Sequence, residues 1–385
     1  MLVNGCERRS IQLVATPGRP AVPEIIDQTR LPHELRLVIL ETVQDAERAI
    51  REMWVRGAPL IGATAAYGMA LAARADPSDK ELEAAALALL DTRPTAVNLR
   101  WAVRDALEKL KRLAPVDRAA AAFENAAALA EADVEICRSI GRHGEEILRG
   151  LADAKRQPGP VQVLTHCNAG WLATVDWGTA LAPVYRAHRS GLPVHVWVSE
   201  TRPRNQGAGL TAWEMAEEGL PHTVVPDNAS GHLLRTGRVD VVIAGTDRTT
   251  AAGDVCNKIG TYMKAVAARD CMVPFYAAVP GPSIDWELGP GQADEIPIEE
   301  RDGTEVSEVR GVSPEGQWTS VRITPAGCGV ANFGFDVTPA RLVSGLITER
   351  GICAASQEGL ASLYPECAAG TPDLDRDTAA EGWNT

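Results

Sequence analysis

The hydrophobic pattern of the chain changes near residue 157. Before that point, apolar side chains recur every three to four residues at 43–55, 78–90, 95–113 and 117–140, the spacing of amphipathic helices. Ala and Leu, both strong helix formers, dominate these segments. Residues 8–15 and 35–41 are short and compatible with strands. We therefore predict a mainly helical N-terminal domain with a small sheet at residues 1–155.

Beyond QPGP (157–160), short apolar runs alternate with helical segments. The runs are VQVLTH, VHVWVS, HTVVPD, VDVVIAG and PFYAAVP, and the expected helices lie at 176–190, 207–219, 228–237 and 253–269. Strands that are apolar throughout are typical of a parallel sheet covered on both faces. The pattern predicts an α/β fold with a Rossmann-like parallel-sheet domain at 156–365.

The remaining segments are less regular. We expect a long loop with a short strand at 285–325, and a helix after Asp336 within 332–352. The tail, residues 366–385, is polar and predicted to be disordered.

Composition narrows the possible partners. The formal net charge of −13 argues against nucleic acid or an anionic membrane, but not against a small phosphorylated ligand. The sequence has no apolar run of membrane-spanning length and no signal-peptide pattern in MLVNGCERRSIQLV. Its eight cysteines form no CxxC pair, and its seven histidines lack metal-ligand spacing. We expect a cytoplasmic protein with reduced thiols and neither a metal nor another cofactor.

Polar side chains follow the predicted strands, at the edge where parallel sheets bind ligands. His166, Cys167 and Asn168 follow the first strand. Gln206 lies in the polar loop after the second strand, and Asp247 follows the fourth. Because buried strands need no such ends for packing, the pattern predicts a ligand site.

Cys167 and Asp247 each allow two interpretations. A lone cysteine is more often a small core residue, but a thiol at a strand-to-helix turn can have its pKa lowered by N–H groups and a nearby Arg. Asp247 can cap a helix or pair with Arg248. A carboxyl group with apolar surroundings, such as VVIAG, can instead stay protonated and act as a general acid.

Three segments are candidate anion sites. Gly253 and Asp254 are expected to lead into a helix that carries Asn257 and Lys258 in its first turns. The other two are RGA (56–58) and Arg93, each ahead of a predicted helix, with Pro94 suited to a first helical position. A capped surface helix explains any one of these patterns alone.

GAGLTA (207–212) fits a relaxed dinucleotide-binding pattern, but it begins several residues after its strand. A nicotinamide-dependent enzyme is therefore disfavoured.

Taken together, the motifs resemble the methylthioribose-1-phosphate isomerase family. The resemblance runs from LPHEL near residue 32 to LITERG near 351, and rests on RGAPLIGATAAYG, RPTAVNLRWAV, THCNAG, ETRPRNQGA, GTDR, GDVCNKIGTY and FDVTP. This family shares its fold with ribose-1,5-bisphosphate isomerase and with regulatory subunits of a translation-initiation exchange factor. An ordered series of seven motifs is far more specific than any one of them.

The resemblance implies residue roles. Cys167 matches the catalytic cysteine of the family and Asp247 its catalytic acid, while the matched substrate-binding residues are Arg56, Gly57, Ala58, Arg93, Gln206, Asn257 and Lys258. The chain departs from the family pattern at Thr246, Ala252 and Cys256, and WLATVDWGTA is bulkier than its family counterpart.

The implied function is isomerisation of 5-methylthioribose 1-phosphate to 5-methylthioribulose 1-phosphate in methionine salvage, by a homodimer. Alternative substrates are 5-deoxyribose 1-phosphate and ribose 1,5-bisphosphate. An alternative of another class is a regulatory subunit that senses a sugar phosphate or nucleotide without turnover. Trp171 and Trp177 could form an apolar wall for the 5-substituent, although core packing explains either one.

Overall fold

The computed structural model describes residues 1–15, 18, 20–94 and 96–368, and it contains the helices predicted for the first part of the chain. They are α1 (Val43–Arg51), α2 (Ala58–Ala75), α3 (Asp79–Thr92), α4 (Val97–Lys111) and α5 (Pro115–Ala154). Helix α2 is enclosed by the other four, which explains why small and apolar residues surround it on every side.

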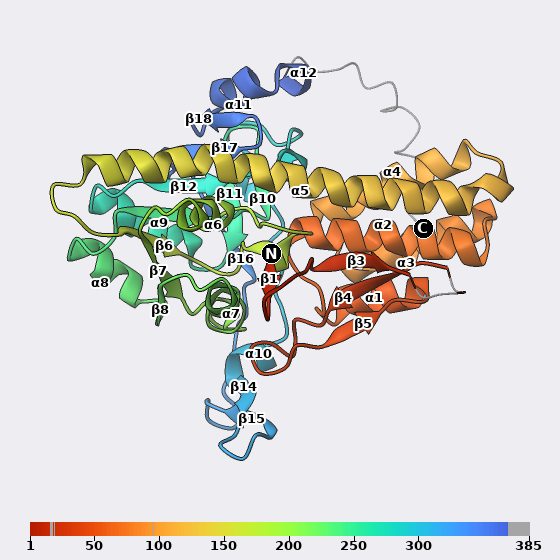
Figure 1. The fold of residues 1–385 in the computed structure, drawn as a ribbon, viewed down its shortest axis with the longest axis horizontal. Helices are drawn as coiled ribbons and strands as arrows, with labels where there is room; N and C mark the ends of the chain where they lie inside the picture. The colour runs from red at the N-terminus through yellow and green to blue at the C-terminus, as the bar shows by residue number, and fades with distance from the viewer. Residues whose placement is uncertain (16–17, 19, 95, 369–385) are drawn as a thin grey trace.

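The small sheet packs beside these helices (Figure 1). It has the order β3 (Ile11–Val14), β4 (Val22–Ile26), β5 (Leu37–Ile39), and all its pairs are antiparallel. Strands β3 and β5 confirm the predictions for 8–15 and 35–41, whereas the central strand β4 was not predicted. A short hairpin of β1 (Leu2–Val3) and β2 (Cys6–Glu7) precedes the sheet.

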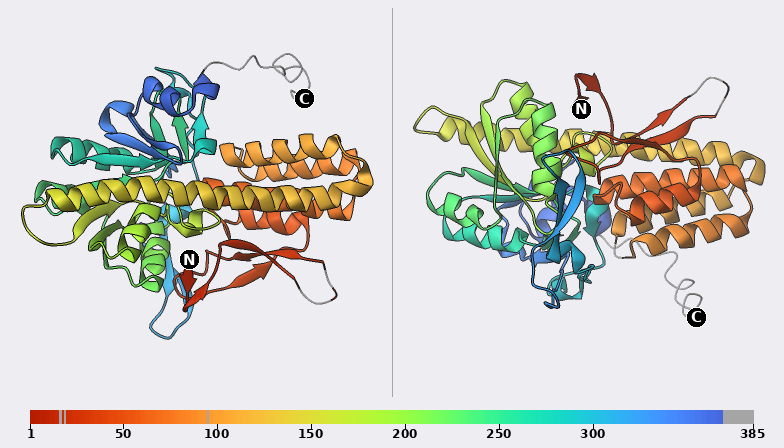
Figure 2. Two further views of the ribbon diagram at one scale, coloured as in Figure 1. Left: turned by 45° about the horizontal axis from the view of Figure 1, so that its top comes forward. Right: turned by 90° about the horizontal axis from the view of Figure 1, so that it is seen from below.

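Helix α5 connects the two parts of the molecule. It has 40 residues and extends alongside both the helical part and the large sheet, as Figures 1 and 2 show. At 1.5 Å per residue it is about 60 Å long. Val134 packs in the core of the helical part, whereas Ile140 and Leu148 pack in the core beside the sheet. The predicted segment 117–140 covers only part of this helix.

The large sheet has the order β18-β17-β12-β9-β6-β7-β8. Its strands are β6 (Val161–Thr165), β7 (Val194–Ser199), β8 (His222–Val225), β9 (Val241–Ala244), β12 (Phe275–Ala278), β17 (Gly345–Thr348) and β18 (Gly351–Cys353). All described pairs are parallel except β17–β18. In chain order the parallel strands follow the 3-2-1-4-5-6 arrangement of Rossmann folds, which confirms the predicted fold class.

Helices flank this sheet, and a second sheet lies at its edge. The helical elements are η1 (Trp171–Ala173), α6 (Ala182–Arg189), η2 (Gly207–Thr211), α7 (Ala212–Glu217), α8 (Ala229–Arg235), α9 (Thr261–Asp270), η3 (Gly281–Ser283), η4 (Ala293–Glu295), α10 (Thr304–Ser307), η5 (Ala340–Leu342), α11 (Gln357–Leu363) and α12 (Pro365–Ala368). The second sheet has the order β13 (Ile284–Asp285), β10 (Arg248–Thr250), β11 (Val255–Lys258), β16 (Phe335–Thr338).

One predicted helix begins later than expected, and another is replaced by strands and a short 3-10 helix. Residues 255–258 form strand β11, because a tight turn at Gly253 (φ 90°) returns the chain antiparallel to β10, and the helix begins only at Thr261. Residues 332–352 form β16, η5, β17 and β18 instead of a helix, because Pro339 interrupts the backbone and Leu346 and Ile347 complete the buried sheet.

The predicted loop at 285–325 contains a hairpin of β14 (Glu308–Val312) and β15 (Trp318–Arg322), which projects from the body in Figure 1. Of the predicted disordered tail, residues 369–385 lie outside the described residues. No helix in the described part of the chain is long and apolar enough to cross a membrane.

Candidate active site

The topology of the large sheet brings two of the predicted residues together. Strand β6 lies between β7 and β9, so the chain order reverses at the β6–β9 pair. Cys167 follows β6 and Asp247 follows β9. Ligands of such sheets bind beyond the carboxyl ends of the strands at this switch point.

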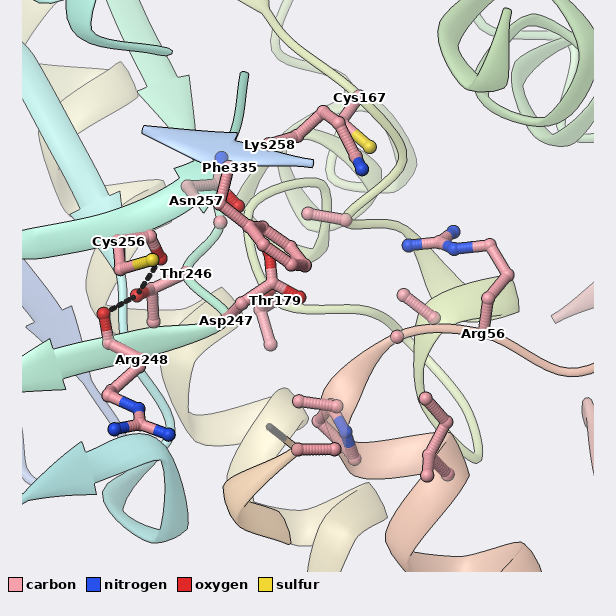
Figure 3. Close-up of a pocket in the computed structure, with 18 of the residues that line it drawn as sticks. Arg56, Cys167, Thr179, Thr246, Asp247, Arg248, Cys256, Asn257, Lys258 and Phe335 are labelled. Carbon is pink, nitrogen blue, oxygen red and sulfur yellow. Dashed lines mark hydrogen bonds between the residues drawn. The ribbon is translucent and has the colours of Figure 1, made fainter. Parts of the chain in front are cut away.

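One cavity at this point is lined by every residue predicted from the sequence for catalysis or substrate binding (Figure 3). They are Arg56, Gly57, Ala58, Arg93, Cys167, Gln206, Asp247, Asn257 and Lys258. The loops after β6 and β7, the loop ahead of β10, strand β11 and the segments around α2 and α3 supply these side chains. The cavity therefore lies where the helical part meets the sheet.

Cys167 is held in a strained turn. Its backbone has φ 63°, a conformation that side chains other than Gly rarely adopt. Its N–H donates to Thr201 Oγ1 at 2.8 Å, and its thiol donates to Gln206 Oε1 at 2.9 Å. Burial raises the pKa of the thiol, while Arg56 and Lys258 act to lower it. The hypothesis of a lowered pKa is therefore wrong for the free protein, because burial outweighs both cations.

Asp247 has the environment that an acid requires. Burial raises the pKa of its carboxyl group, and Lys258, Arg56 and Arg93 oppose this rise. Its own N–H donates to the carbonyl of Cys256 at 2.9 Å, which fixes the backbone. The direction of the shift agrees with a group that holds a proton longer than an exposed aspartate does.

Asn257 and Lys258 line the cavity from strand β11 and not from a helix N-terminus, so the predicted dipole contribution there is wrong. Lys258 Nζ lies 4.7 Å from the centroid of the Phe335 ring, and burial lowers its pKa. Asn257 donates to Thr261 Oγ1 at 3.0 Å. A strand that carries an amide and an amine at its end can bind an anion through these two side chains, without a helix N-terminus.

The Arg56–Gly57–Ala58 loop meets the cavity at the start of α2. Gly57 has φ 93°, and a Cβ there would lie 2.4 Å from the carbonyl oxygen of Ala173, so only glycine fits. The guanidinium of Arg56 donates to the side-chain and backbone oxygens of Asn168. Figure 3 shows this guanidinium, the Cys167 thiol and the Lys258 amine pointing into the same space.

Arg93 is paired within the protein. It ends α3, and α4 begins only at Val97, so Pro94 is not a first helical residue as predicted. Its guanidinium donates to Glu299 at 3.0 Å. Glu299 belongs to a segment whose neighbours Ile296 and Pro297 line the cavity. Sequence reasoning missed this segment because it reads only as an irregular loop.

The two tryptophans after Cys167 are not part of the cavity wall. Trp171 is fully buried in the core beside the sheet, where it packs against Trp213. Trp177 lies under the guanidinium of Arg189. The suggested apolar wall is therefore wrong, and core packing, the alternative interpretation of each residue, is confirmed.

Apolar contacts to the cavity come instead from Met53, Ile61, Ile296 and Phe335. Phe335 stands in the FDVTP motif, the one sequence signal that pointed to it. Cys256 also lines the cavity, and burial raises its pKa to about 12. Within the described ranges, no group of three or more His, Cys, Asp or Glu side chains could hold a metal ion.

Comparison with known proteins identifies the family of this chain. The model of the Initiation factor 2 subunit family matches residues 54–355. A methylthioribose-1-phosphate isomerase from Sinorhizobium medicae is 60% identical over 343 residues, 89% of this chain and 94% of that protein. One from Rhodospirillum centenum is 59% identical over 367 residues, 95% of this chain and 96% of that protein.

Comparison with solved structures points to the same families. The 5-methylthioribose 1-phosphate isomerase from Pyrococcus horikoshii OT3 has a TM-score of 0.80 at 36% identity, covering 94% of this chain and 96% of its own. The translation initiation factor eIF-2B, subunit delta, from A. fulgidus has a TM-score of 0.76 at 38% identity, covering 93% and 100%. These matches confirm the resemblance predicted from the motifs. The chain belongs to the Initiation factor 2 subunit family and to the methylthioribose-1-phosphate isomerase family.

Proposed function

We propose that the protein converts 5-methylthioribose 1-phosphate to 5-methylthioribulose 1-phosphate, with Cys167 and Asp247 as its acid–base pair. The names of the relatives support the reaction. The observation that carries the assignment of residues is one cavity lined by the Cys167 thiol, the Asp247 carboxyl group and the cationic side chains of Arg56, Arg93 and Lys258, with Arg248 and Cys256 also in its wall. A regulatory subunit that only binds a ligand would need neither the thiol nor the acid.

The cationic side chains of the cavity provide the binding site for the phosphate of the substrate. Arg56 and Lys258 face the cavity, and Arg93 lies at its edge in a pair with Glu299. Guanidinium groups bind phosphate oxygens in a bidentate manner, and a buried amine contributes a concentrated positive charge. The phosphate on C1 thus binds among these groups and sets the position of C1 and C2.

The reaction must open a ring that the phosphate locks. Asp247 donates its proton to the ring oxygen as the bond from C1 to that oxygen breaks. Cys167, as thiolate, takes the proton from C2, which gives an enol between C1 and C2. The thiol then returns its proton to C1, and the hydroxyl on C2 returns a proton to Asp247 as the ketone forms. Both groups end in their starting states, as catalysis requires.

The thiolate needs the cations. Burial raises the pKa of the Cys167 thiol, and Arg56 and Lys258 are the largest contributions in the opposite direction. A buried anion is stabilised only by such partners. The same cations therefore serve two purposes, the phosphate and the thiolate.

A substrate panel tests the proposal. Methylthioribose, 5-deoxyribose and ribose 1-phosphates and ribose 1,5-bisphosphate are supplied to the full chain, and the ketose is detected directly. Turnover of methylthioribose 1-phosphate with the highest kcat/KM is the expected result. Binding of these compounds without any ketose product would favour the regulatory alternative.

Solvent deuterium distinguishes proton transfer from a hydride shift. Proton transfer through Cys167 predicts that deuterium from the solvent enters at C1 of the product to the extent that the thiol exchanges its proton with solvent before returning it. Any carbon-bound deuterium in a product formed in D₂O would refute a direct shift from C2 to C1, and its complete absence would count against the thiolate step.

A homodimer and a place in methionine salvage stay predictions of the family resemblance, and a cytoplasmic location stays a prediction from the composition. Light scattering of the purified chain tests the first of them.

A further inference from the structure

Glu214 is a buried carboxylate next to the cavity that the proposed reaction does not use. It lies on α7, its side chain is fully buried, and it is not among the cavity-lining residues. Burying a carboxylate without partners is costly, so the groups around it indicate what it does. No sequence motif pointed to it.

The carboxylate of Glu214 accepts four hydrogen bonds. Oε1 accepts from Leu172 N at 2.7 Å and from Asn168 Nδ2 at 3.0 Å. Oε2 accepts from the Tyr185 hydroxyl at 2.6 Å and from Trp171 N at 3.1 Å. All four partners donate, which matches the acceptor-only character of an ionised carboxylate. Burial raises the pKa of Glu214 to about 7, and the hydrogen bonds oppose this rise, so the ionised form prevails at pH 8.

These hydrogen bonds fix the loop that leaves Cys167. Asn168, Trp171 and Leu172 all belong to it. A Cβ on Gly170 would lie 1.7 Å from Glu214 Oε2, so the loop closes tightly around the carboxylate. The loop and the carboxylate therefore form one unit.

The side-chain amide of Asn168 links Glu214 to Arg56, which lines the cavity. Its Nδ2 must face Glu214, because a carboxylate only accepts, and Nδ2 also donates to Thr211 Oγ1 at 3.2 Å. Its Oδ1 then faces the opposite way, where it accepts from the guanidinium of Arg56. A flipped amide would turn an NH₂ group toward the cation and lose this contact.

We infer that Glu214 is a positioning residue which, through the amide of Asn168, holds the Arg56 guanidinium in place beside the Cys167 thiol. The inference deepens the proposed function, because Arg56 is one of the cations assigned to the phosphate and the thiolate. It does not depend on which sugar phosphate binds. It also does not require Glu214 to contact the substrate.

The test is a double-mutant cycle read from the reactivity of the Cys167 thiol. Glu214→Gln is made in the wild-type chain and in the Arg56→Ala chain. Alkylation by iodoacetamide at pH 8 is followed for each cysteine by peptide mass spectrometry. In the wild-type chain we expect Glu214→Gln to slow alkylation of Cys167 about three- to tenfold, because the displaced guanidinium no longer favours the thiolate.

In the Arg56→Ala chain the same substitution should change the rate less than about 1.5-fold, since coupled residues give non-additive effects. An unchanged rate in the wild-type chain, an equal change in both chains, or faster alkylation of Cys167 would each overturn the inference. Because alkylation needs no substrate, a wild-type chain that turns over none of the panel refutes the proposed function without deciding this test.

Two controls separate positioning from loss of stability. Cys137 is fully buried in α5, so faster alkylation at this position reports loosening of the fold. Asp133→Asn alters another buried carboxyl group that has no described hydrogen bond to Arg56 or Asn168, and because Asp133 accepts from the Cys137 thiol, Cys137 serves as the reporter only in the chains that keep Asp133. This substitution should leave the Cys167 rate unchanged, and a slowing as large as that of Glu214→Gln would count against the inference.

Discussion

Asp133 should make the protein less stable as the pH rises, and Asp133→Asn should remove this effect. The residue lies within α5 and is 7% exposed. One oxygen accepts from Val175 N at 2.7 Å. Burial raises the pKa of Asp133 to about 7, the Val175 hydrogen bond opposes the rise, and the negative charge of Asp176 adds to it. An asparagine keeps the acceptor and carries no charge.

The magnitude follows from the two protonation states. The unfolded chain releases the proton near the ordinary aspartate pKa of 3.8, and the folded chain near 7. Below the first value the full stability contribution is present, and it is lost as the pH rises through the second, because the folded state then holds a buried charge. A pKa difference of about 3 corresponds to about 4 kcal/mol, of which about 3 kcal/mol falls between pH 5 and pH 8.

Urea unfolding followed by tryptophan fluorescence measures this effect at pH 5, 6, 7 and 8. The unfolding free energy of Asp133→Asn minus that of the wild type should rise by about 3 kcal/mol over this range. The difference removes opposing contributions such as that of His166, whose pKa burial lowers to about 3. Asp153→Asn, an exposed change on the same helix, is the matched control. A difference that stays flat with pH would refute the assignment of a raised pKa to Asp133.

Three further predictions concern the cavity and the loop beside it. Cys167→Ser should lower kcat about a thousandfold without changing Tm, because a hydroxyl does not ionise at neutral pH. Asp247→Asn should have a similar effect. Near-normal turnover in either variant would remove that residue from the mechanism. Lys258→Ala should mainly raise KM if the amine holds phosphate, and steady-state kinetics with a fall in kcat alone would contradict this role. Gly170→Ala should lower Tm by about 5 °C or more, since its Cβ would lie 1.7 Å from a buried carboxylate oxygen, whereas Gly150→Ala, with nothing within 4 Å, should not.

The large sheet and its ligand-binding edge could be predicted from the sequence, because the apolar pattern of each strand is a local property of the chain. Apolar runs such as VVIA (241–244) are typical of a parallel sheet covered on both faces, and the polar residues that follow such strands then share one edge. Cys167 and Asp247 were found in this way, Arg56 and Arg93 were found as candidate anion sites ahead of predicted helices, and the family motifs assigned both arginines to the substrate. Their gathering in one cavity follows from the strand order, which no single segment encodes.

The errors came from segments whose structure depends on distant partners. VCNK (255–258) forms a strand only because β10 and β16 pair with it on either side. Glu214 appeared to be one of several acidic residues in a helical segment, and only the fold shows that its helix turns it toward Asn168. Likewise, Glu299 could be linked to the site only through its hydrogen bond from Arg93, a residue about two hundred positions away in the chain.

Backbone strain helps to decide between the two interpretations of Cys167. Residues other than Gly with positive φ cost of order 1 kcal/mol or more each and persist only where surrounding contacts hold them. Cys167 (φ 63°) and Thr201 (φ 65°) are both of this kind, and the first donates its N–H to the hydroxyl of the second. Cys137, a core cysteine, lies instead within the regular helix α5. Trp177 (φ 68°) has the same conformation outside the cavity, so the strain acquires meaning from its place: Cys167 lines the cavity directly after β6, and this combination favours a role for Cys167 there.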